Sequence, residues 1–259
     1  MPSALRSATA TAATPSKAVA VKKDEPVNEI PELDTYKATT IDEKISGLKL
    51  VTDAIAQQRQ TASRSILYHP ATIAAMVLAV SIVTHFLYNS VHDLPAVGCT
   101  CIGIFMALLV LIQKYTQPYL DEAEAMNWDW MKNADGVQDQ MYVTQYGKEV
   151  IGTTIVRLTA PVKKTKKDAA VAGRAEIRGW AVRMRYRNKG IGGDLLRETI
   201  RQVKKQLGED AEIVFAKDHA AHYRPLYRTF NAPMDRDEAR AKVSLQKAVA
   251  EYETGAAKK

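Results

Sequence analysis

The stretch from Trp180 to Leu196, WAVRMRYRNKGIGGDLL, decides the fold of this 259-residue chain. Residues 175–182 alternate in polarity as a strand does. From Ile191 onward, apolar residues recur with the spacing of one helix face, and Gly208 provides a C-terminal cap. The sequence therefore predicts a strand, a glycine-containing turn and an amphipathic helix in direct succession.

The turn in this stretch is suited to holding a pyrophosphate. Glycines allow the backbone to approach a phosphate closely. The free N–H groups at the start of the helix, together with the positive end of its dipole, face the anion. Short glycine patterns also occur by chance, so the alternative is an ordinary strand–turn–helix packing unit.

The motif Arg/Gln-x-x-Gly-x-Gly/Ala is matched by Arg187, Gly190 and Gly192. On these residues the chain resembles the GNAT superfamily of N-acetyltransferases, and by its layout the membrane-hairpin, camello-like branch. The resemblance implies an α+β fold, with a mixed sheet flanked by helices and an inserted two-helix transmembrane hairpin. Met184 and Asn188 depart from the pattern, because Pro and Gly are usual there.

Acetyl-CoA is the co-substrate that the resemblance implies, and the sequence contains no metal-ligand spacing. The expected activity is transfer of the acetyl group to an amine by direct attack. The residues expected to bind the cofactor lie at the end of the strand and in the turn: Val182, Arg187, Asn188, Lys189, Gly190, Ile191, Gly192 and Gly193.

Two residues are candidates for proton transfer. Glu176 lies on the cofactor strand, where some family members carry a catalytic glutamate; the alternative is a surface carboxylate paired with Arg178 or another basic residue. Tyr227 matches the family tyrosine that lies near the departing sulfur; the alternative is a packed aromatic. Asn231 and Ala232 stand where that family segment has Gly and Phe, so this motif is degraded.

Two apolar blocks predict membrane-spanning helices. Residues 65–92 and 94–113 contain no Asp, Glu, Lys or Arg. Each approaches the roughly 20 residues that a helix needs to cross about 30 Å of hydrocarbon. The alternative is a helical hairpin buried in a soluble protein.

The basic residues next to these blocks predict their orientation. Lys49, Arg59, Arg64 and Lys114 flank the two spans, and the connecting loop has neither Lys nor Arg. Both termini are therefore expected in the cytosol. The endoplasmic reticulum or a related endomembrane is the expected location, and a mitochondrial membrane ranks below it.

The expected partners are a lipid bilayer and an amine acceptor, either a small molecule or a protein. The net charge is +7, but acidic residues interrupt the basic ones and no basic and aromatic array is present, so nucleic acid is not expected as a partner. The basic run Lys163–Lys167 is either a solvated loop or a contact for anionic lipid headgroups.

The expected division of the chain has five parts. A disordered tail (1–33) precedes the first strand and helix (34–66), the transmembrane hairpin (67–116), the remaining acetyltransferase-like domain (117–231), and a charged C-terminal helix and tail (232–259). The last part replaces two strands that usually wall the acceptor site. The alternative function is therefore a catalytically degenerate fold that assists assembly of another membrane protein of the endoplasmic reticulum.

The remaining secondary structure is predicted from periodicity. Asp42 is the expected N-cap of the first helix. Strands are expected at 35–41, 141–146, 149–158 and 211–216, and helices at 42–60, 119–132, 219–230 and 236–251.

Overall fold

The structure, a computed structural model, describes residues 32–133, 136–160 and 173–255. The predicted tail lies outside these residues except for its last two positions. The basic run Lys163–Lys167 also lies outside them.

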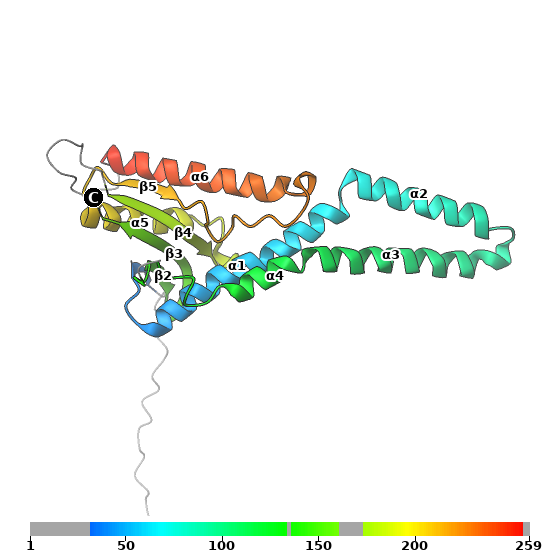
Figure 1. Ribbon diagram of the computed structural model, residues 1–259, viewed down its shortest axis with the longest axis horizontal. Helices are drawn as coiled ribbons and strands as arrows, with labels where there is room; N and C mark the ends of the chain where they lie inside the picture. Colours follow the sequence, from blue (N-terminus) through cyan, green and yellow to red (C-terminus); the bar gives the residue numbers. More distant parts are fainter. Residues whose placement is uncertain (1–31, 134–135, 161–172, 256–259) are drawn as a thin grey trace, which may run out of the picture. The chain divides into compact units, whose positions relative to one another are not determined.

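The core of the described chain is a five-stranded sheet in the order β1-β2-β3-β4-β5 (Figure 1). Neighbouring strands from β1 to β4 are antiparallel, whereas β4 and β5 are parallel. The strands are β1 (Leu33–Lys37), β2 (Gln140–Tyr146), β3 (Glu149–Thr159), β4 (Arg174–Val182) and β5 (Glu212–Phe215). The sheet thus confirms a mixed α+β architecture.

Six α-helices accompany the sheet in the described residues. They are α1 (Ile41–Leu67), α2 (Pro70–Leu87), α3 (Leu94–Thr116), α4 (Pro118–Ala125), α5 (Ile191–Leu207) and α6 (Ala232–Glu253). The N-cap of α1 is Thr40, which forms a capping box with Glu43, so the predicted cap at Asp42 is wrong. Helix α4 ends before the predicted Lys132, because the Asn127 side chain accepts backbone hydrogen bonds and forms a turn.

The sheet is covered on both faces. On one face, α1 buries Val51 and Ile55 against β2 and β3. On the other face, α5 buries Leu195 and Ile200 against the sheet, and α6 adds Leu245 to the same cluster. The amphipathic pattern after the glycine turn therefore has a structural cause, because its apolar face fills the core.

Helices α2 and α3 form an antiparallel hairpin that inserts between α1 and α4. Every residue of α2 is at least partly exposed, and in α3 only Ile112 and Thr116 are buried. By length and composition, both helices are apolar enough to cross a membrane.

The segment after β5 differs from its prediction. Instead of a helix over 219–230, the chain forms a loop with one short 3-10 turn, Arg228–Phe230. Pro225 disfavours helical geometry at the preceding residue. Side chains also bond locally in this loop, as where Asn231 Nδ2 donates to the Leu226 carbonyl at 3.2 Å. The predicted C-terminal helix is confirmed as α6.

Candidate active site

A cavity of about 610 Å³ lies beside the C-terminal half of β4. Its wall comes from the second half of α1, the end of β4, the turn before α5, the loop after β5 and the first half of α6. The volume falls within the range of pockets that bind small molecules and cofactors.

The cavity exists because β5 pairs only with the first part of β4, from Arg174 to Ile177. Their register ends at Ile177, which faces Phe215. The Ala220 N–H then donates to the Arg178 carbonyl at 2.7 Å and closes one end of the gap. Beyond Arg178, no strand in the described chain pairs with the β5-facing edge of β4.

Two backbone N–H groups of β4 point into this gap. The Arg183 N–H donates to the Ile151 carbonyl on β3 at 2.8 Å. Because N–H groups alternate between the two edges of a strand, those of Trp180 and Val182 face the opposite edge. They are placed to donate to a ligand that lies along β4.

The turn before α5 lies at the other end of the gap, opposite the hydrogen bond between Ala220 and Arg178. Gly190 has φ +87° and Asn188 has φ +61°, so both adopt the left-handed conformation. Asparagine tolerates this conformation better than most side chains, which explains why it can stand in the usual glycine position. Among the described residues, the backbone N–H groups of 188–192 have no hydrogen-bond acceptor. These donors at a helix N-terminus suit an anion.

Gly192 is required by close packing. A Cβ atom at this position would lie 2.9 Å from Cζ2 of Trp180. The indole of Trp180 therefore packs directly beneath the first turn of α5. The glycine lets helix and strand approach, and the turn stays open toward the cavity.

Arg187 fixes the turn to its neighbours. Its Nε donates to the Val182 carbonyl at 2.8 Å, and its Nη2 donates to Gln57 Oε1 on α1 at 2.9 Å. The guanidinium therefore positions the turn between β4 and α1.

Most of the predicted cofactor residues line the cavity: Val182, Arg187, Asn188, Gly190, Gly192 and Gly193. Two do not. Ile191 is buried in the packing under α5, and the Lys189 ammonium lies 5.4 Å from the centre of the Tyr186 ring.

The two predicted catalytic side chains are not among the residues that line the cavity. Glu176 pairs with Arg174 at 3.2 Å, which agrees with the alternative of a strand-surface carboxylate paired with a basic residue. Tyr227 is 77% exposed. Both roles stay predictions that the positions of these side chains do not support.

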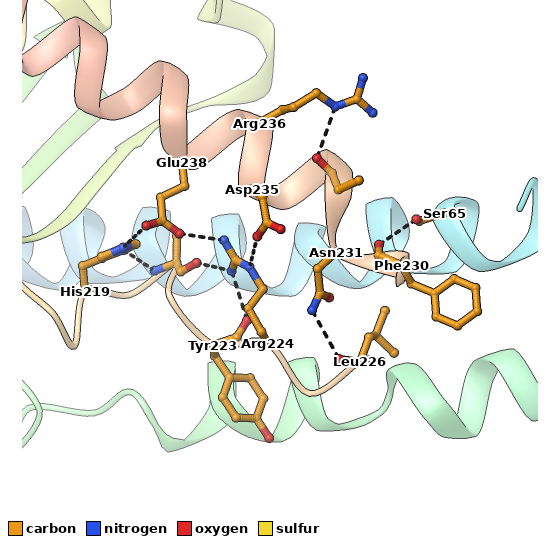
Figure 2. Close-up of polar contacts among 12 residues, drawn as sticks. Ser65, His219, Tyr223, Arg224, Leu226, Phe230, Asn231, Asp235, Arg236 and Glu238 are labelled. Atoms are coloured by element: carbon orange, nitrogen blue, oxygen red, sulfur yellow. Dashed lines mark hydrogen bonds and ion pairs between the residues drawn. The ribbon is translucent and has the colours of Figure 1, made fainter. Parts of the chain in front are cut away.

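Charged side chains gather at the closed end of the gap, and Figure 2 shows how they meet. Arg224 of the β5–α6 loop binds Glu238 of α6 at 3.0 Å and Asp235 at 3.3 Å. His219 Nε2 lies 3.8 Å from Glu238 Oε1. We call His219, Arg224 and Glu238 the charged end of the cavity, and the turn 187–193 the glycine end.

Burial and neighbouring charges shift the pKa values of His219 and Glu238. Burial lowers the pKa of His219, and the nearby Glu238 carboxylate offsets this only in part. Burial works to raise the pKa of Glu238, but Lys242, His219 and Arg224 hold it below its ordinary value. At neutral pH, His219 is therefore an uncharged imidazole and Glu238 is a carboxylate.

A cluster of buried ion pairs lies next to the charged end, around Arg178. Arg178, which lines the cavity, binds Asp139 at 2.8 Å, and Asp139 also binds Arg157 at 3.2 Å. The Arg178 guanidinium lies 4.1 Å from the centre of the Trp130 ring. This cluster fixes β4 where it diverges from β5.

Sequence reasoning missed the charged end. His219 and Glu238 come from a loop and a helix that no local motif links. Asp218, His219 and His222 lie close together in the sequence, but their spacing alone indicates no specific role. The one available signal was that α6 is charged where the family usually has strands.

The acetyltransferase (GNAT) family model matches residues 106–231. This segment runs from α3 through the β5–α6 loop, and in it the chain is similar to GNAT-type acetyltransferase domains. No curated protein matches the sequence. A solved structure, a transcriptional regulator from Bacillus halodurans C-125, is 13% identical and aligns over 71% of this chain and 82% of that one. Its TM-score is 0.30, a similarity too low to support any statement about fold or function.

Proposed function

We propose that the protein transfers the acetyl group of acetyl-CoA to an amine by direct attack. The observation that carries this proposal is the gap beside β4, which leads from the charged end to the unpaired backbone donors of the glycine end. A pyrophosphate at the glycine end leaves the Trp180 and Val182 N–H groups in line for the pantetheine arm and the thioester carbonyl.

The residues of the chain would bind and orient the reactants. Backbone N–H groups at 188–192 would hold the phosphates, and Arg187 would keep the turn in register with β4. The amine must approach the thioester as a neutral nucleophile, since a free lysine amine has a pKa of about 10.4. Glu176 and Tyr227 remain the proton-transfer residues that the family resemblance suggests.

We further propose that α2 and α3 anchor the domain to the endoplasmic reticulum or a related membrane, with both termini cytosolic. Apolar exposed surface on both helices supports anchoring. Within this proposal the chain keeps the predicted division at 33, 66, 116 and 231. A cysteine introduced at Ser90, in a chain with Cys99 and Cys101 replaced by serine, should react with an impermeant maleimide only from the lumen. Labelling from the cytosol would reject this orientation.

A second candidate is an acetyltransferase-like scaffold that assists assembly of another membrane protein. It is favoured by the exposed position of Tyr227 and by α6, which stands in place of the usual final strands. A stable membrane partner in mild detergent, together with no acetyl-CoA binding, would support it.

Calorimetry with acetyl-CoA tests the leading proposal. Gly190→Asp should abolish binding, because it adds a negative charge and a side chain at φ +87°. Gly208→Asp is the matched control, since Gly208 also has positive φ, at the other end of α5 and away from the cavity. Equal binding by both variants, or no binding by the folded wild type, would reject the proposal.

A further inference from the structure

His219 carries a hydrogen-bond donor that no described residue accepts. Its Nδ1 accepts a hydrogen bond from the Ala221 N–H at 3.2 Å. A neutral imidazole that accepts at Nδ1 carries its proton at Nε2. The closest carboxylate oxygen, Glu238 Oε1, is 3.8 Å away, which is beyond hydrogen-bond distance. Among the described residues, the Nε2–H therefore has no acceptor within reach.

The position of His219 matches the place where a thioester would react. The next residue, Ala220, donates its N–H to the Arg178 carbonyl and closes the gap beside β4. Arg178 lies about 13 Å along the strand from Val182, at roughly 3.3 Å per residue. A cofactor with its phosphates at the glycine end and its arm along β4 would bring its sulfur toward this closed end.

The surroundings keep the imidazole uncharged. The His219 side chain is 12% exposed, and burial is the main cause of its lowered pKa. The charged groups around it are Glu238 and Lys242 on α6 and Arg224 in the same loop, with His222 nearby. Only Glu238 favours the protonated form, and it does not outweigh the rest.

We propose that His219 donates a hydrogen bond from Nε2 to the sulfur of the thioester as that sulfur leaves. The inference rests on the proposed acetyl transfer and assigns a catalytic residue to it. The amine nitrogen forms its bond to the carbonyl carbon, the C–S bond breaks, and the electron pair goes to sulfur. The proton released by the nitrogen passes through water to the thiolate, which gives the amide and the free thiol of CoA. His219 stabilises the thiolate and keeps its own proton.

The pKa of the thiol of bound CoA reports on the hydrogen bond between His219 and the sulfur, and it can be measured without an amine substrate. We would measure thiolate absorbance as a function of pH for the protein with CoA and for the protein without CoA, and subtract the second from the first. Cys99 and Cys101 would be replaced by serine in both samples. The wild-type protein should lower the thiol pKa relative to free CoA, and His219→Ala should raise it again by about one unit. His219→Gln should keep most of the lowering, because the amide can still donate. His222→Ala, an exposed change in the same loop, should match the wild type.

The outcomes separate this inference from the proposed function. An equal thiol pKa in CoA-bound wild type and His219→Ala overturns the role of His219 and leaves acetyl-CoA binding intact. No CoA binding by wild type overturns the proposed function and the inference with it. A nitrogen NMR spectrum of the wild-type histidines gives an independent check. A His219 ring protonated at Nδ1 would overturn the inference, whatever the variants do.

Discussion

The glycine end and the charged end of the cavity are built in different ways. The glycine end is made mostly of main chain, from one continuous segment in which Gly190 and Asn188 hold left-handed conformations. The charged end is made of side chains from the β5–α6 loop and α6, joined by ion pairs such as Arg224–Glu238.

The difference shows where each end is vulnerable. A site made of backbone donors tolerates most side-chain changes but depends on conformation at a few glycines. A site made of paired charges tolerates backbone adjustment but suffers when one partner is lost, because a buried charge is left without compensation.

Asp139→Ala should cause the largest loss of stability, about 3–5 kcal/mol, because it leaves Arg178 buried without its main partner. The carboxylate is 2% exposed and binds two arginines. Asp218→Asn is the control: it contacts the same guanidinium at 3.5 Å but is 59% exposed, and should cost under about 0.5 kcal/mol. Denaturant unfolding in mild detergent measures the free energy of unfolding of both variants. Similar small decreases in the two would show that the buried ion pairs of Asp139 contribute little to stability.

Gly192→Ala should destabilise the protein by about 1–3 kcal/mol and weaken acetyl-CoA binding, because its Cβ would press on Trp180. Gly193→Ala, one residue later, is the control. Its Cβ would come no closer than 3.8 Å to Arg197, so it should be neutral or slightly stabilising in the helix. Thermal unfolding compares the stability of the two variants, and calorimetry measures acetyl-CoA binding by Gly192→Ala. A harmless Gly192→Ala would mean that the glycine end does not depend on this close approach.

Arg224→Ala should loosen the charged end locally. Arg224 joins the β5–α6 loop to α6 through Asp235 and Glu238, so its loss should lower the opening free energy of 216–231 by about 1–2 kcal/mol. Hydrogen exchange of the loop amides measures this. Lys242→Ala removes a 57% exposed partner of the same Glu238 and should leave exchange unchanged. Equal exchange rates in the two variants would show that the more buried ion pairs of Arg224 stabilise the loop no more than the exposed pair of Lys242 does.

The smallest predicted effect is on pH dependence. His219 has a lowered pKa in the folded protein, so near and below pH 6.5 the unfolded chain binds more protons and stability rises with pH. Glu238, whose pKa is lowered from 4.5, adds stability above that pH and loses it on further acidification. His219→Gln should flatten the slope below pH 6.5 in detergent unfolding curves, and an unchanged slope would contradict the lowered pKa.

The sequence was informative where structure is local. The strand, turn and helix around Gly190 follow from residue spacing within one segment, as do the β2–β3 hairpin and the two apolar helices. Periodicity failed at 219–230, because Pro225 and contacts with α6 outweigh the helical pattern. The pairing of His219 with Glu238 depends on how a loop and a distant helix meet, which no local pattern encodes. Glu176 lies at the strand position that the family resemblance indicates, but its side chain pairs with Arg174 and does not line the cavity, so its role stays a prediction.

Helix α1 has a consequence for what the protein can reach. It is one continuous helix of 27 residues that contacts the glycine end through Gln57 and stops at Leu67, just before α2. At 1.5 Å per residue, about 15 Å of rigid rod separate these two points. If α2 enters a bilayer as proposed, the length of α1 sets the distance between the acetyl donor and the lipid surface. The protein would then select an acceptor by the distance of its amine from that surface.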